Sequence, residues 1–271
     1  MTGRVVSVHG GEYGIDESGE GPPLLYLHGL WEADARPLAS ELARSHRVIA
    51  PSLPGFGLTT GEERLRSVSD AVYSLLDLLD EIGLDRAPVV GSCLGAMFAA
   101  ELAVTQPDRF PAVVLLAPFG MWDDADPGID AFTATPAELA EALCGSDGSA
   151  GGGTAPETSL LGPGAVPFDG LSAPEVVELR LARARALAGA ARFLWPIPDR
   201  GLASRAHRLP ARTLVVVGEE DRICPPGPAS RIVNGNGSGG SQLETVAGAG
   251  HLVYEHDPRF VGTLVAGFVS G

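Results

Sequence analysis

Short apolar runs and amphipathic stretches alternate along most of the chain. Seven runs have the length and composition of β-strands, and several of them, such as Thr213–Gly218, are apolar at nearly every position. Continuous apolar runs are typical of parallel strands that are covered on both faces, whereas half-exposed strands alternate between apolar and polar residues. The pattern therefore predicts a mostly parallel sheet. Its predicted strands are Val5–Val8, Pro23–His28, Arg47–Ala50, Pro88–Gly91, Ala112–Ala117, Thr213–Gly218 and Leu243–Val246.

Helical patterns lie between the predicted strands. The stretch Ser69–Ile82 carries its leucines and a valine on one face and is followed by Gly83, a residue type favoured just after a helix. The stretch Cys93–Thr105 is small and apolar, and it stops before Pro107, because the residue before a proline disfavours helical backbone. Strands that alternate with helices predict an α/β fold with a doubly wound sheet.

The alternation is interrupted over residues 121–205. Helical patterns at Pro136–Leu143 and Pro174–Leu194 flank a Gly/Ser/Pro-rich stretch, Gly145–Gly164, and no strand pattern lies between them. We interpret residues 121–205 as a helical lid inserted into the core over the carboxyl edge of the sheet, with a flexible segment at Gly145–Gly164. The predicted core comprises residues 1–120 and 206–271.

The clearest chemical signal is the sequence Gly91-Ser92-Cys93-Leu94-Gly95, which joins a predicted strand to a predicted helix. Gly-x-nucleophile-x-Gly in this context is typical of a nucleophile elbow, a sharp turn whose neighbours must be small. The start of a helix also favours an anion at the nucleophile. We therefore predict that Cys93 is a catalytic nucleophile.

Two later segments complete a catalytic triad. The strand Thr213–Gly218 runs into an acidic turn that contains Asp221, and a Gly-Ala-Gly-His sequence that ends at His251 follows the last predicted strand. The order nucleophile, acid, histidine suits a base, His251, that takes the proton of Cys93 while Asp221 orients its imidazole. Asp123 is a weaker alternative for the acid.

A strand that ends in His28-Gly29-Leu30-Trp31 is the fourth element of the predicted site. Its turn directs the backbone N–H of Leu30 at a developing oxyanion, and the N–H of Leu94 completes the predicted oxyanion hole. The bulky Trp31 is expected to narrow the acyl side of the pocket. The residues expected to line the substrate pocket are His28, Gly29, Trp31 and Ser92.

With these motifs the sequence resembles the α/β-hydrolase superfamily over nearly its whole length. Gly218–Pro226, Gly248–His251 and Trp195–Leu202 resemble the lid-bearing branch that contains carbon–carbon bond hydrolases, epoxide hydrolases and small esterases. The elbow Gly91–Gly95 is locally similar to that of dienelactone hydrolases, which carry a cysteine nucleophile. The resemblance implies an α/β-hydrolase fold. Cys93 departs from the aspartate of epoxide hydrolases and from the serine of most esterases.

The expected function is hydrolysis or transfer of the acyl group of a small-molecule ester, lactone or thioester, in bacterial secondary metabolism. An alternative keeps the fold and makes the protein a lyase, isomerase or cyclase that uses His251 as a general base. A non-catalytic ligand-binding protein is the third interpretation. Fold alone does not decide among these functions.

Composition excludes some partner classes. The net charge is −15, which argues against nucleic acid as a partner. The chain shows neither a signal peptide pattern nor a transmembrane run, and its cysteines, Cys93, Cys144 and Cys224, are an odd number without paired spacing. We therefore expect a cytoplasmic protein that acts on a small molecule and does not bind membranes. No cofactor or metal is predicted, since the aspartates of residues 123–126 fit a solvated turn.

Overall fold

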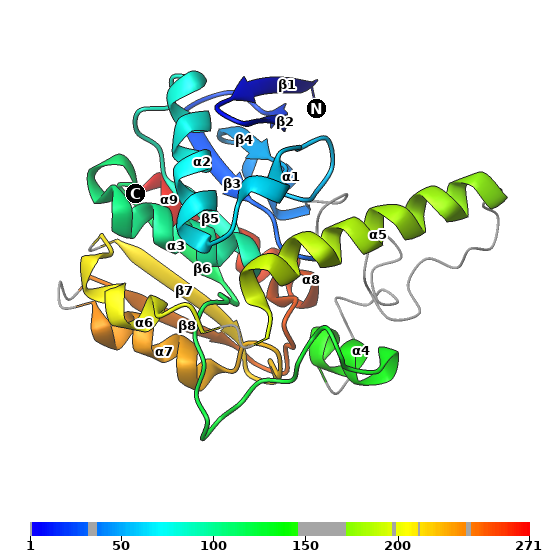
Figure 1. Ribbon diagram of the computed structural model, residues 1–271. Coiled ribbons are helices and arrows are strands. Elements are labelled where there is room, and N and C mark those ends of the chain that lie inside the picture. The colour runs from blue at the N-terminus through cyan, green and yellow to red at the C-terminus, as the bar shows by residue number, and fades with distance from the viewer. Residues whose placement is uncertain (1, 32–36, 146–171, 197–198, 211, 237–239) are drawn as a thin grey trace.

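A single twisted sheet forms the centre of the protein in the computed structural model (Figure 1). Its strand order is β1-β2-β4-β3-β5-β6-β7-β8; β1, β2 and β4 pair in antiparallel fashion, and every other neighbouring pair is parallel. The strands are β1 Thr2–Val8, β2 Gly11–Ser18, β3 Pro23–Leu27, β4 Arg47–Pro51, β5 Val89–Ser92, β6 Val113–Leu116, β7 Thr213–Gly218 and β8 Gln242–Val246. The structure describes residues 2–31, 37–145, 172–196, 199–210, 212–236 and 240–271.

The continuous apolar runs are central parallel strands, as predicted. Every residue of β5, β6 and β7 is buried, because helices cover both faces of the sheet at these positions. All seven predicted strands are present, within three residues of their predicted ends. The mostly parallel α/β fold is thereby confirmed.

Strand β2 was not predicted. It pairs with β1 in an antiparallel hairpin and also with β4, so it joins the hairpin to the parallel part of the sheet. Its sequence contains two glycines and three acidic residues, and only Tyr13, Gly14 and Ile15 are buried. The apolar signal is therefore too short to identify a strand from the sequence.

The helices form a layer on each face of the sheet (Figure 1). The side chains of α2, α3, α6 and α7 belong to one apolar cluster, and those of α1, α8 and α9 belong to the cluster on the opposite face. The helices of the core are α1 Pro37–Leu42, α2 Val68–Glu81, α3 Leu94–Thr105, α6 Leu202–Arg205, α7 Pro226–Gly235, α8 Val253–His256 and α9 Pro258–Ser270, with 3₁₀ turns at Glu62–Arg64, Pro107–Arg109 and Ala206–Arg208.

Between β6 and β7 the structure shows α4, Pro136–Cys144, and α5, Ala173–Leu194, close to their predicted bounds. Helix α5 extends outward from the body, and its last turns pack on the core (Figure 1). A Cβ atom at Gly189 of α5 would lie 3.0 Å from the Cα atom of Gly55, so the helix and that loop are in close backbone contact. The predicted flexible stretch, apart from Gly145, lies outside the described residues, and so do residues 197–198 of the segment Trp195–Leu202.

The described ranges contain neither a membrane-spanning helix nor a cluster of metal-ligating side chains. No helix in them is long and apolar enough to cross a membrane. No group of three or more His, Cys, Asp or Glu side chains in the same ranges is placed to hold a metal ion.

Candidate active site

Cys93 occupies the sharp turn between β5 and α3. Its backbone has φ 54° and ψ −115°, a conformation that residues with a side chain rarely adopt. The Cys93 N–H donates to the carbonyl oxygen of Leu116 at 2.8 Å, which ties the strained residue to the neighbouring strand β6. Strain of this kind is concentrated at functional sites. The geometry is that of the nucleophile elbow expected from the sequence.

The two glycines of the elbow are required by close backbone contacts. A Cβ atom at Gly91 would lie 2.4 Å from the carbonyl oxygen of Gly95. A Cβ atom at Gly95 would lie 2.1 Å from the carbonyl oxygen of Leu27 and 2.5 Å from that of His28. The start of α3 is therefore pressed against the end of β3, and this contact brings the elbow beside the turn that holds the other predicted oxyanion donor.

Asp221 and His251 form the pair expected from the sequence. Asp221 Oδ2 lies 2.9 Å from His251 Nδ1, and both residues are buried. The second carboxylate oxygen, Oδ1, accepts the backbone N–H groups of Ile223 at 2.9 Å and Cys224 at 2.8 Å. These hydrogen bonds fix the carboxylate in place. Because Nδ1 of His251 faces Asp221, the other ring nitrogen, Nε2, points away from the carboxylate.

Asp123, the weaker alternative for the acid, lies elsewhere. Its carboxylate pairs with the guanidinium of Arg231, and its Oδ1 accepts the N–H of Ala125 at 3.0 Å. These contacts make Asp123 part of an ion pair and a turn, so the described structure assigns the acid position to Asp221.

The imidazole of His251 is surrounded by aromatic rings, the carboxylate of Asp221 and two cysteine side chains. Burial alone would lower the pKa of His251, but the negative charge of Asp221 and the interaction with Cys93 outweigh burial and raise it well above the ordinary value for histidine. The rings of Trp31 and Phe119 lie 5.1 Å and 5.7 Å from the imidazole, centroid to centroid. Nε2 is buried and has no hydrogen-bond partner in the described structure, so this nitrogen is available for proton transfer.

Cys224 is a neighbour of the site that was not among the predicted site residues. Its thiol lies beside the imidazole of His251, and burial raises the pKa of Cys224 to about 12. The thiol therefore stays protonated at neutral pH, which distinguishes Cys224 from a nucleophile. The sequence signal for this neighbour is its position three residues after Asp221, because the turn that places Asp221 beside His251 also places Cys224 there.

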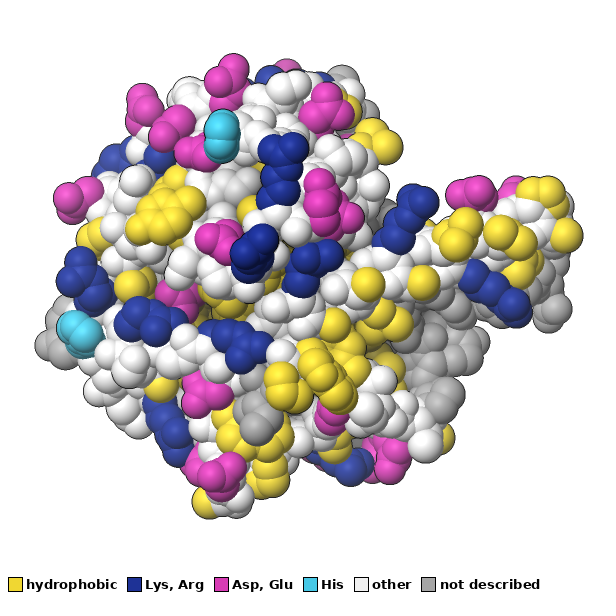
Figure 2. Space-filling model, in the orientation of Figure 1, with side chains coloured by type: hydrophobic (Ala, Val, Ile, Leu, Met, Phe, Trp, Pro, Cys, Tyr) yellow, Lys and Arg dark blue, Asp and Glu magenta, His cyan; other side chains and the backbone are white. Residues whose placement is uncertain are grey.

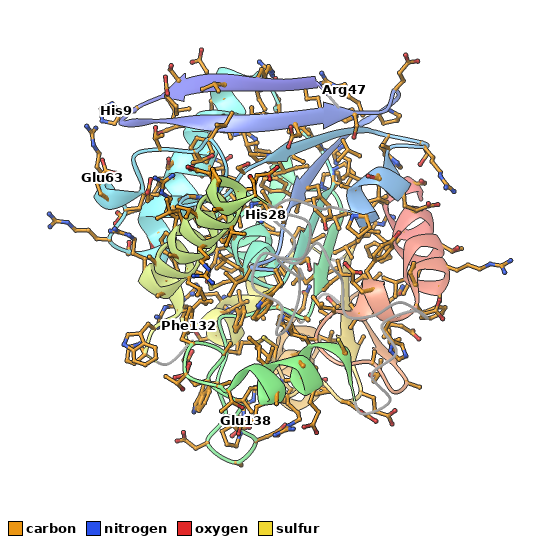
Figure 3. All side chains as sticks on the ribbon, turned by 90° about the vertical axis from the view of Figure 1, so that its right-hand side faces the viewer. His9, His28, Arg47, Glu63, Phe132 and Glu138 are labelled. Atoms are coloured by element: carbon orange, nitrogen blue, oxygen red, sulfur yellow. The ribbon has the colours of Figure 1, made fainter. Side chains whose placement is uncertain are left out.

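His28 differs from its predicted role. The N–H of Leu53 donates to His28 Nε2 at 2.9 Å, which leaves the proton on Nδ1, and Nδ1 lies 2.8 Å from the carbonyl oxygen of Gly29 (Figure 3). Both ring nitrogens are therefore used by the backbone, and the ring is fully buried. This arrangement corrects the assignment of His28 to the substrate pocket: the imidazole supports the turn at Gly29 and Leu30.

The remaining predicted residues lie around Cys93 and His251. Leu94 is the first residue of α3, so its N–H has no acceptor within the helix, and Leu30 lies buried in the turn after β3. Ser92 is buried at the end of β5. Trp31 is 4% exposed, and its indole N–H has no hydrogen-bond partner in the described structure. The predicted oxyanion donors and Trp31 are thus contributed by the elbow and the turn after β3.

A model of the Alpha/beta hydrolase family matches residues 24–263, a range that contains the elbow, the acid and the histidine. The chain belongs to this family. One relative, 2-hydroxymuconate semialdehyde hydrolase from Pseudomonas sp. (strain CF600), is 29% identical over 99% of this chain and 94% of its own length. Another, 2-hydroxy-6-oxo-2,4-heptadienoate hydrolase from Pseudomonas putida, is 33% identical over 48% of this chain, and the match spans only 49% of that relative.

Solved structures show the same fold. The meta-cleavage product hydrolase from Pseudomonas fluorescens IP01 superposes with a TM-score of 0.72 and 22% identity, over 99% of this chain and 97% of that one. At this identity the likeness concerns the fold.

In this α/β hydrolase, helix α4 is attached to the loop that carries the histidine. The backbone N–H groups of His251 and Leu252 donate to the carbonyl oxygens of Ala142 and Leu143, each at 3.0 Å. These carbonyls lie in the last turn of α4, where no helical donor is available to them. Sequence analysis did not predict this attachment, because it joins backbone groups that no residue type specifies.

The same inserted segment also contacts the loop of the acid. The N–H of Ile129 donates to the carbonyl oxygen of Arg222 at 2.6 Å, and the Arg222 guanidinium lies 3.0 Å from Glu141 of α4. A Cβ atom at Gly145, just after α4, would lie 2.4 Å from the carbonyl oxygen of Gly248. The segment around α4 is therefore fitted closely against both loops that position Asp221 and His251.

Proposed function

We propose that this α/β hydrolase cleaves, or transfers the acyl group of, a small-molecule ester, lactone or thioester through an acyl intermediate on Cys93. The observation that carries the proposal is the placement of Cys93 on the strained elbow, with the buried Asp221–His251 pair as its base. The hydrolases among the relatives support the reaction class. The setting we expect is bacterial secondary metabolism.

The proposed reaction has two halves. His251 takes the proton of Cys93 as Sγ forms a bond to the acyl carbon; the bond from that carbon to the leaving oxygen or sulfur then breaks, and His251 delivers this proton to the leaving group. Water then gives a proton to His251 and attacks the thioester carbon, the bond from that carbon to Sγ breaks, and His251 returns the proton to Cys93 as the acid is released. Negative charge on the carbonyl oxygen in both halves is stabilised by the N–H groups of Leu30 and Leu94.

Trp31 supplies a further contact to the substrate in this proposal. Its indole N–H is buried without an acceptor, and such donors are rare in native proteins. The ring lies against His251, so an oxygen close to the reacting carbonyl is the acceptor we propose. This contact favours substrates that carry a second oxygen, such as a keto, hydroxyl or carboxylate group, near the acyl carbon.

Turnover by cysteine variants tests the proposal. Cys93→Ala is expected to abolish hydrolysis of p-nitrophenyl esters and acyl thioesters, with folding verified by circular dichroism. Cys144→Ala is the matched control, because Cys144 is also a buried cysteine outside any disulfide but lies at the end of α4. Substantial turnover by Cys93→Ala, together with its loss in His251→Ala, would instead support general-base chemistry without a covalent intermediate.

A further inference from the structure

A groove of about 510 Å³ lies apart from the triad, where α2, α3 and α5 meet. The start of α2 and the last turns of α3 form two of its walls, and the end of α5 together with Arg200 and Arg205 forms the others. Figure 2 shows several dark blue side chains gathered over this part of the face. Neither Cys93 nor Asp221 nor His251 lines the groove.

The charge of the groove is opposite to that of the protein. Four arginines line it, Arg66, Arg192, Arg200 and Arg205, and they face one acidic residue, Glu101. The groove thus has an excess of three positive charges on a chain whose net charge is −15. A concave surface of one sign concentrates ligands of the other sign.

Two of these arginines already have internal partners. Arg205 pairs with the buried carboxylate of Glu101. Arg200 donates to backbone carbonyl oxygens, among them that of Asp199 at 2.8 Å and that of Trp195 at 3.2 Å. Both side chains therefore hold the walls of the groove in place.

The other two arginines do not hold the walls of the groove, although Arg66 lies near the carboxylate of Asp70, which accepts its backbone N–H. Within the part of the chain that the structure describes, the guanidinium groups of Arg66 and Arg192 have no hydrogen-bond or ion-pair partner, and both residues are exposed. Arg66 precedes α2 and Arg192 lies near the end of α5, so the two approach the groove from different elements. An anion between them would receive charge-assisted hydrogen bonds from planar donors that suit phosphate.

The rest of the lining suggests what such an anion carries. Val72, Val104 and Phe193 contribute apolar surface, and Ser69 and Thr105 contribute hydroxyl groups. We propose that this groove binds a phosphate-bearing small molecule, with the phosphate on Arg66 and Arg192 and an apolar group on the surface below them. The site does not depend on the acyl chemistry proposed for Cys93, because it shares no residue with the triad.

Calorimetric titration at low ionic strength tests the proposal, with inorganic phosphate and phenyl phosphate as probes. Saturable binding of one phenyl phosphate per chain is expected, tighter than that of inorganic phosphate. Arg66→Ala and Arg192→Ala should each weaken it by about tenfold or more, the effect of losing a hydrogen bond to a charged group. Arg259→Ala is the matched control, since Arg259 is exposed on α9 outside the groove.

The control separates a built site from general attraction. Unchanged affinity in Arg259→Ala, with losses in the two groove variants, would support the proposal. Absence of saturable binding, or equal losses in all three variants, would overturn it. Steady-state kinetics of acyl-substrate turnover then tell whether the phosphate belongs to the substrate or to a separate ligand. Phenyl phosphate raises the apparent KM without changing kcat in the first case, and it does not give this competitive pattern in the second.

Discussion

Replacing Trp31 by phenylalanine separates the hydrogen bond that we propose for its indole N–H from the packing of its ring. The substitution keeps an aromatic ring beside His251, which now lies 5.1 Å from the Trp31 ring, and removes the buried donor that has no partner. Stability and catalysis should therefore respond differently, because only a bound substrate satisfies that donor.

The magnitudes follow from the burial of the side chain. Trp31 is 4% exposed, so the smaller ring leaves a void that costs about 1 kcal/mol of unfolding free energy. Removal of an unsatisfied buried donor should raise the unfolding free energy by about 1–3 kcal/mol. The variant should thus be as stable as the native protein or slightly more stable. Loss of one hydrogen bond to substrate, about 0.5–1.5 kcal/mol, should lower kcat/KM by roughly 2- to 13-fold.

The assay compares kcat/KM for two p-nitrophenyl esters that differ by a keto oxygen next to the acyl carbon, together with urea unfolding. Trp31→Phe should lose activity toward the keto ester and little toward the plain ester. Phe119→Leu is the control, since Phe119 also packs on His251 but carries no donor. A Trp31→Phe protein that loses several kcal/mol of stability and treats both esters as before would refute the reasoning.

Four further predictions concern the framework of the site. Asp221→Asn removes the charge that raises the pKa of His251, so the acidic limb of the kcat/KM profile, where His251 becomes a free base, should move to lower pH. Because the pKa of His251 is raised in the folded protein, the Asp221–His251 pair should stabilise the native state fully at pH values below the pKa of an unfolded histidine. This contribution should be lost as the pH rises through the raised pKa of folded His251. Urea unfolding measured at several pH values checks this. Gly145→Ala should push the end of α4 from Gly248 and lower kcat beyond what the folded fraction, measured by circular dichroism, explains. Gly95→Ala should cost about 3 kcal/mol or more in thermal unfolding, because its contact is with backbone; a fully stable variant would contradict the close packing of the elbow.

The residues predicted to form the triad could be singled out in the sequence because each stands in a local pattern. The elbow needs small residues on both sides of Cys93, and the contacts of Gly91 and Gly95 show the physical reason. Asp221 and His251 each follow a strand that ends at the same edge of the sheet, so their pairing follows from the parallel topology. Short-range sequence signals therefore sufficed for these residues.

Contacts between distant backbone groups were not predictable in this way. The role of His28 depends on the N–H of Leu53, and the support of His251 depends on carbonyl groups at the end of α4. Neither partner is distinguished by its residue type. Strand β2 was missed for a related reason, because its pairing with β1 and β4 requires few apolar side chains.

The central claim is a covalent acyl intermediate on Cys93, and the mass of the intact protein tests it most directly. The protein is mixed briefly with an acyl thioester, quenched in acid and compared with Cys93→Ala, and proteolysis then locates any added mass. The proposed function predicts an acyl group on the peptide that contains Cys93, which disappears on longer incubation and never forms in the variant. Product release without an adduct at any time, at equal rates in both proteins, would contradict it.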